Sequence, residues 1–117
     1  MNPVPPANNP SAAPPPFETW TLIVWRVVRG RERAFLAAWG DLRAALDALE
    51  RPPCWCLLLE NQHEAGLFYA FGPWDDPAAV EAMRRDPAVQ DAFQRLIDCC
   101  HEVDFGTYGK IRQPLTA

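Results

Sequence analysis

The side chains best suited to metal or thiol chemistry occur as Cys54-x-Cys56 and Cys99-Cys100, with His63 and His101 as the only histidines. A metal site would need these pairs to meet a histidine, but they lack the CxxC spacing of zinc sites. The first pair lies in an apolar, strand-like run, and adjacent cysteines late in a helix point about 100° apart. We therefore expect buried free thiols and no metal site.

Other candidate reactive groups are single residues in apolar surroundings. Arg26 interrupts an apolar run, where it would either stabilise a bound anion or pair with an acid at the sheet edge. Tyr69 would hydrogen-bond a substrate oxygen or serve as a core aromatic, and His63 would act as a base or sit solvated in a turn. Trp74 follows Gly72-Pro73 and is either a pocket wall or a plug where a strand meets a helix.

No stronger catalytic pattern occurs in the sequence. It contains no Gly-rich phosphate loop, no nucleophile elbow and no carboxylate cluster with metal spacing. The catalytic candidates are therefore Trp74, Arg26 and Tyr69.

Length, composition and charge are those of one globular domain. The chain has 117 residues, of which 49% are hydrophobic and 22% charged, and its formal net charge is −4. Nucleic-acid binding needs clustered Lys and Arg, so it is not expected. Arg29, Arg31 and Arg33 are close together, but Glu32 lies among them, which favours a solvated helix start.

The N-terminal segment 1–16 is rich in proline and should stay extended and mobile. It has neither the basic start nor the apolar core of a secretory signal. No later apolar run approaches the roughly 18 residues that span a bilayer, so no membrane contact is expected. We expect a cytoplasmic protein with one folded domain over 17–113 and a short tail over 114–117.

The periodicity predicts an α+β domain. Strand patterns cover 19–28, 54–60, 67–71 and 105–112, and a helix pattern over 32–49 ends at Pro52-Pro53. Asp76-Pro77 and Asp86-Pro87 each supply an N-cap followed by proline at the first helical position, which predicts a helix broken in two. The order βαββαβ is ferredoxin-like: a four-stranded antiparallel sheet with the helices on one face.

Both faces of the predicted sheet are apolar. In the first strand, Trp20, Leu22 and Val24 share one face, and Ile23, Trp25 and Val27 share the other. Helices cover only one of these faces, and soluble monomers rarely expose so large an apolar area. We therefore predict a homodimer in which two sheets stack and enclose a shared interior.

Three stretches carry a resemblance to a known family. They are 28–35 (a strand end, glycine turn and helix start), 67–74 (a strand that ends in tryptophan), and Trp74-Asp75-Asp76-Pro77 with the later break at Asp86-Pro87. The resemblance extends over roughly 19–112, nearly the whole folded region. The chain resembles a small antibiotic biosynthesis monooxygenase domain, a member of the dimeric α+β barrel superfamily.

The resemblance implies site residues only where positions match. Trp74 matches the tryptophan that lines the pocket in oxygenase members. Met83 stands where the haem-degrading branch has a histidine, and 19–28 lacks that branch's asparagine. Axial haem ligation then has no evident donor, so haem degradation is disfavoured and no cofactor is expected. Haem binding through His63 or His101 is the remaining alternative.

The expected pocket walls are aromatic and apolar: Trp25, Trp55, Tyr69, Phe71, Trp74 and Met83. Such walls suit a small, flat, hydrophobic ligand with one or two polar groups. The first hypothesis is a cofactor-independent monooxygenase that oxidises an aromatic or quinol-like substrate with O2. The second is a non-catalytic dimer that binds a small hydrophobic ligand or serves as an accessory protein in a pathway. Isomerase or cyclase activity is a third option.

Overall fold

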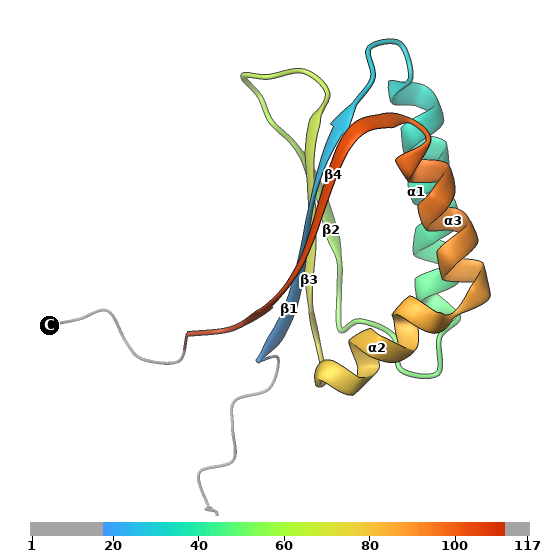
Figure 1. Cartoon of the computed structure of the whole chain (residues 1–117). Helices are drawn as coiled ribbons and strands as arrows, with labels where there is room; N and C mark the ends of the chain where they lie inside the picture. The colour runs from blue at the N-terminus through green and yellow to red at the C-terminus, as the bar shows by residue number, and fades with distance from the viewer. Residues whose placement is uncertain (1–17, 112–117) are drawn as a thin grey trace, which may run out of the picture.

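The computed structural model describes residues 18–111, and these form one antiparallel sheet covered on one face by helices (Figure 1). The predicted tails 1–16 and 114–117 lie outside the described residues. In chain order the elements are β1 (Thr19–Val27), α1 (Glu32–Asp47), β2 (Leu57–Glu60), β3 (Leu67–Trp74), α2 (Pro77–Arg85), α3 (Pro87–Ile97) and β4 (Cys100–Gly109). The strand order β2-β3-β1-β4 confirms the predicted ferredoxin-like fold.

β1 is a central strand, paired with β3 on one side and β4 on the other. Its burial alternates at every residue, with odd-numbered positions buried and even-numbered positions half-buried. Because side chains alternate between the faces of a strand, the odd-numbered set faces the helices. Trp25 is fully buried there, where its ring packs against Phe35 and Phe93.

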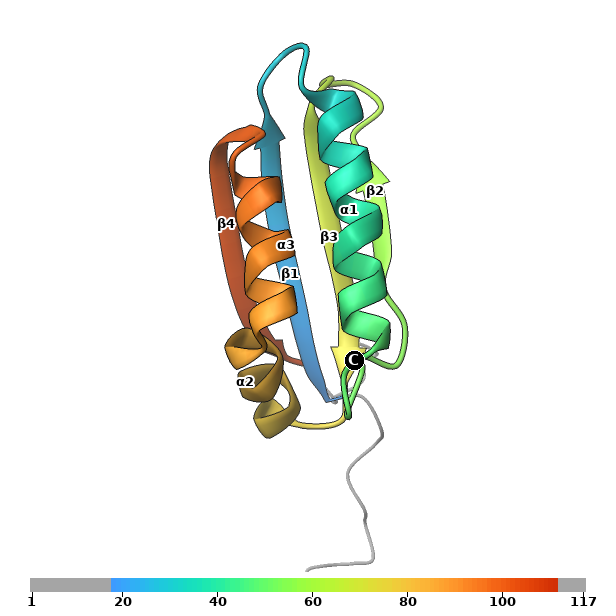
Figure 2. The same cartoon turned by 90° about the vertical axis from the view of Figure 1, so that its right-hand side faces the viewer.

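The helices begin where the sequence predicts. The Asp76 side chain accepts a hydrogen bond from the Ala79 amide, and Asp86 caps α3 in the same way through Val89. Proline follows each cap, so the break at Asp86 separates α2 from α3 as expected. Seen from the helix side, α1 and α3 run side by side over the sheet, and α2 lies at one end of it (Figure 2).

Three strands have boundaries that differ by more than one residue from the predictions. β3 continues through Gly72 and Pro73 to Trp74, since pairing with β1 extends to Thr19. β2 begins at Leu57 and not at Cys54, because the preceding segment crosses the end of β3 instead of pairing along it. β4 begins at Cys100 and ends at Gly109, so Cys99-Cys100 marks a turn and a strand start, not a helix.

The sheet face without helices is largely apolar over β1, β2 and β3, as predicted, and carries Glu102 and Asp104 on β4. We call it the open face: it carries the even-numbered side chains of β1 and the β2–β3 and β4 residues opposite them in register. Trp55, Leu57, Leu59 and Tyr108 are 42%, 46%, 49% and 53% exposed on it. Trp55 also makes an edge-on ring contact with Trp20, with centroids 5.5 Å apart.

Gly72 permits a close backbone crossing. A Cβ at this position would overlap the carbonyl oxygen of Trp55. We therefore expect Gly72→Ala to lower the free energy of unfolding by about 1–3 kcal/mol, the usual cost of overpacking. Gly40→Ala is the control, because Gly40 lies within α1 with open space around it and should gain about 0.5–1 kcal/mol. Urea unfolding of both variants checks this, and equal stabilities would contradict it.

Candidate functional site

A small apolar cavity lies between the sheet and the helices. We call it the inner cavity; its volume is about 30 Å³, and Thr21, Cys56, Trp74 and Met83 are among its walls. The remaining lining residues from the sheet, α1 and α3 are apolar or glycine. A cavity of this size holds little more than one water-sized molecule. Because its walls are almost wholly apolar, it favours a small apolar guest over water.

Trp74 is both the wall of this cavity and the plug at the strand-to-helix junction. It is the last residue of β3 and is 2% exposed. Its indole Nε1–H donates to Thr21 Oγ1 on the neighbouring strand, at 2.9 Å. This bond fixes the ring and satisfies a buried donor. The Thr21 hydroxyl keeps its own hydrogen to donate elsewhere.

One side of the inner cavity is closed by the segment 51–56, of which Pro53 and Cys56 are lining residues. The Cys54 amide donates to the Pro73 carbonyl at 3.0 Å, and Arg51 forms an ion pair with Asp76 at 2.7 Å. The Arg51 hydrogen bond, and then the Ala79 amide, hold the pKa of Asp76 below its ordinary value. The segment is thus tied to β3 and to the start of α2.

Arg43 reaches this segment from α1, where its Nη1 donates to the Cys56 carbonyl at 3.2 Å. Arg43 is half-buried, so it is not one of the solvent-facing residues of the helix. Its spacing of four from Trp39, a cavity residue, was the sequence signal that could have placed it correctly.

The Cys56 thiol is not activated. Burial raises its pKa above the ordinary value, Arg43 opposes the shift, and Asp47 adds to it. The thiol is therefore neutral near pH 7. As a result, no charged side chain of residues 18–111 lines the inner cavity.

A larger groove adjoins the inner cavity on the side of α2, α3 and β4. We call it the outer groove; its volume is about 290 Å³. Met83, Phe93 and Phe105 line both spaces and so form the partition between them. The polar residues that line the outer groove are Arg84, Gln90 and Gln94, and we call them its rim.

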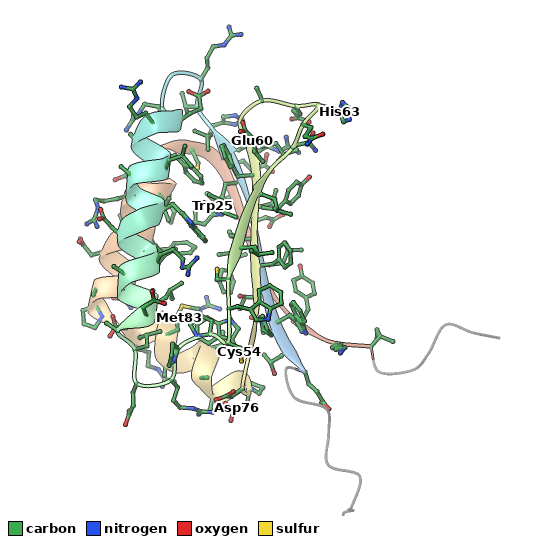
Figure 3. All side chains as sticks on the ribbon, turned by 180° about the vertical axis from the view of Figure 1, so that it is seen from behind. Trp25, Cys54, Glu60, His63, Asp76 and Met83 are labelled. Atoms are coloured by element: carbon green, nitrogen blue, oxygen red, sulfur yellow. The ribbon has the colours of Figure 1, made fainter. Side chains whose placement is uncertain are left out.

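The structure does not bring the predicted pocket residues together within one chain. Trp74 and Met83 line the inner cavity. Phe71 also borders it, but its register opposite Leu22 and its ring contact with Trp55 place its ring on the open face. Trp25 lies on the same sheet face, as Figure 3 shows, but it belongs to the packed core and lines neither space. Tyr69 and Trp55 lie on the open face.

Arg26 also lies on the open face, at the end of β1. It pairs with Glu64 at 2.6 Å and with Glu102 at 3.3 Å, and its side chain is 38% exposed. This is the sheet-edge pairing that we weighed against anion binding. Arg26 and Tyr69 therefore lie on the side of the sheet away from the inner cavity.

The histidines and cysteines form no common site. His63 lies at the hairpin turn, far along the sheet from Cys54 and Met83 (Figure 3), and its amide donates to Asn61 Oδ1. Within residues 18–111, no group of three or more His, Cys, Asp or Glu side chains could hold a metal ion. The cysteines are free, but the prediction that they are buried holds only for Cys99, because Cys56 and Cys100 are half-buried and Cys54 is exposed.

No helix in the described part of the chain has the length and apolar character needed to cross a membrane.

Solved structures with the same fold exist in several organisms. A conserved protein from Methanosarcina mazei has a TM-score of 0.73 at 13% identity, and the match covers 81% of this chain and 95% of that one. A proposed antibiotic biosynthesis monooxygenase from Caulobacter crescentus gives 0.73 at 13% identity, covering 83% and 94%. A mutant of SnoaB, a cofactor-independent oxygenase from Streptomyces nogalater, gives 0.70 at 17% identity, covering 86% and 99%.

These matches confirm that the fold is that of the proteins named antibiotic biosynthesis monooxygenases. At such low identities they establish the fold alone. No protein-family model matches the sequence. No curated protein matches it either.

The Trp74–Thr21 hydrogen bond can be tested by removing only its acceptor. Thr21→Val keeps the side-chain volume but leaves the buried indole N–H unpaired, so we expect a loss of about 1–3 kcal/mol in the free energy of unfolding. In a Trp74→Phe background the same change should cost clearly less, because no donor is left unpaired. Denaturant unfolding of the four proteins measures the coupling, and additive losses would show that the bond contributes nothing.

Proposed function

We propose that this chain is a cofactor-independent oxygenase that oxidises a small aromatic or quinol-like substrate with O2. The observation that carries the proposal is the apolar inner cavity beside Trp74, separated from a ligand-sized groove only by side chains that line both spaces. The fold shared with SnoaB supports the same reading. The inner cavity would hold O2, and the outer groove would hold the aromatic body of the substrate.

The reaction needs no external reductant. A substrate carbanion or phenolate passes an electron to O2, and the resulting radicals combine to form a C–O bond. At an activated CH2 carbon, the peroxide takes up a proton and loses water to leave a C=O group. One oxygen atom enters the product and the other leaves as water, so the four electrons that reduce O2 all come from the substrate.

The chain's own residues then have three tasks. Met83 and Phe93 move to bring the two spaces together and, with the other apolar walls, exclude water from the reactive anion. Trp74, held by Thr21, fixes the shape of the cavity. The Thr21 hydroxyl is the polar group available to donate to an oxygen atom in the cavity.

A second candidate is a non-catalytic binder of a small hydrophobic ligand. The favouring observation is that Cys56, a neutral thiol, is the only titratable side chain among the inner cavity's described walls. The site therefore offers no general base, and an oxygenase substrate would have to be acidic enough to ionise without one.

We also propose that two chains pair through their open faces as a homodimer. Trp55, Leu57 and Leu59 are exposed at the β2 edge of the open face, and Tyr108 is exposed at the β4 edge. Trp20 of β1 connects the two edges, since its ring contacts Trp55 and it lies opposite Tyr108 in register. Arg26 with Glu64 and Glu102 forms a charged rim at one end. This arrangement of apolar centre and polar edge is that of a protein interface.

The oxygenase proposal is tested by narrowing the inner cavity from its wall. Cys56→Leu should lower O2 uptake at least about tenfold, because the larger side chain occupies the space for O2 and shifts the reactants. Cys54→Leu is the matched control: Cys54 lies two residues away, is exposed and lines neither space. Uptake with a panel of anthrones and quinols, with ¹⁸O2 incorporation, provides the measurement. If none of these proteins takes up O2, the non-catalytic binder is favoured. If the variants and the unaltered chain react at equal rates, the reaction does not take place in the inner cavity.

The dimer is tested with two leucines of equal exposure. Leu59 lies on the open face and Leu36 on α1, and both are 49% exposed. We expect Leu59→Lys to convert the dimer to a monomer in native mass spectrometry, since it buries an unpaired charge between the sheets. Leu36→Lys should stay dimeric. A monomeric unaltered chain at micromolar concentration would contradict the proposal.

A further inference from the structure

The outer groove has an aromatic floor and a single fixed charge. Phe93 and Phe105 provide flat apolar surface, and both of them, like Met83, also line the inner cavity. Its volume of about 290 Å³ is near the lower limit of ligand pockets, roughly 300 Å³. It therefore suits a ligand of about two fused rings. Arg84 is the only charged side chain among the described residues that line either space.

Arg84 is held in place by an aromatic ring instead of an acid. Its Cζ lies 4.9 Å from the Phe105 ring centroid, a cation–π contact that positions the guanidinium over the floor of the groove. Neighbouring arginines are neutralised: Arg85 pairs with Glu81, and Arg95 with Asp91 and Asp41. Within residues 18–111 Arg84 makes no such ion pair, so its planar N–H edge stays available to a ligand.

The neutral polar groups of the rim are already engaged. Gln90 Nε2 donates to the Arg84 carbonyl, and Gln94 Nε2 donates to Asp98 Oδ1, each at 2.9 Å. The first of these bonds also ties α3 to the turn of α2 that carries Arg84. These side-chain amides do not offer a competing charge, so the guanidinium sets the electrostatic preference of the groove.

We propose that Arg84 is a specificity residue that selects flat aromatic ligands carrying one negative oxygen group. The anionic group would meet the guanidinium edge while the rings lie on Phe93 and Phe105. A carboxylate fits best because it accepts two parallel N–H bonds, and a phenolate accepts one. The inference rests on the proposed function, which places the aromatic body in this groove, and it names the charge that the substrate must carry.

The test compares an anion with its neutral isostere. 2-Naphthoate and 2-naphthamide have the same rings and nearly the same shape. 2-Naphthol is neutral at pH 7 and anionic at high pH, so it tests a phenolate in the same way. Binding is followed on full-length protein by the methyl NMR signals of methionine. The chain has two methionines, Met1 and Met83, so the signal of the groove residue is assigned at once with Met83→Leu.

Arg84→Gln should weaken 2-naphthoate binding at least about tenfold, which corresponds to about 1.4 kcal/mol, and leave 2-naphthamide unchanged. Arg85→Gln is the matched control, because it removes the same charge one residue away from a side chain that lines neither space. The anion preference of the unaltered chain should appear as tighter binding of 2-naphthoate than of 2-naphthamide, and of 2-naphthol at high pH than at pH 7.

Three results would overturn the inference: equal effects of the two arginine variants, no preference for the anion, or binding that leaves the Met83 methyl signal unmoved. None of these measurements depends on turnover. A protein that binds 2-naphthoate through Arg84 but consumes no O2 would refute the oxygenase and keep the selected ligand class. A protein that consumes O2 but binds its substrate without Arg84 would keep the oxygenase and refute the role of Arg84.

Discussion

A sheet with apolar side chains on both faces has to be covered twice, and this constraint organises the molecule. β1 imposes it, because its odd-numbered residues are buried under the helices while its even-numbered residues are only half-buried. Covering the first face produces the core around Trp25 and leaves the inner cavity at one end. The second face keeps Leu57, Leu59 and their neighbours partly exposed, which is costly for an isolated chain. The candidate site and the proposed dimer surface therefore lie on opposite sides of one layer.

The place of the inner cavity follows from residue sizes across the sheet. On the helix side, Trp25 of β1 lies opposite Phe68 of β3, and these large rings fill the space beneath α1 and α3. Toward the other end, Ile23 lies opposite Ala70, and Thr21 lies opposite Gly72. Small residues in consecutive rows leave volume that the helices do not fill. Gly72 serves a second purpose there, since its missing side chain lets the segment 51–56 close the cavity.

The fold was predictable to a large extent, and the site much less so. Strand alternation and the two Asp-Pro caps are local signals, so the element order, the helix break and the two apolar faces followed from sequence. The end of β3 did not, because Gly72-Pro73 is a local turn signal that pairing with β1 overrides. The aromatic residues predicted to line one pocket lie on two faces of the sheet, since the face on which each side chain lies depends on the strand register. Arg84 was missed because its contact with Phe105 joins a helix to a strand distant in sequence.

The charge of Arg84 lies outside the inner cavity, and this placement has a physical advantage for chemistry with O2. A guanidinium inside so small an apolar space would be costly to desolvate and would draw in water. On the groove's rim, Arg84 stays hydrated until a ligand displaces that water, and its stacking on Phe105 reduces the side-chain freedom lost on binding. A bound anion is then stabilised at its charged end, while its rings lie against the apolar partition that faces the cavity. The proposed oxygenase would thus favour the ionised substrate without placing a base beside O2, which is the chemistry that the uncharged walls around Trp74 permit.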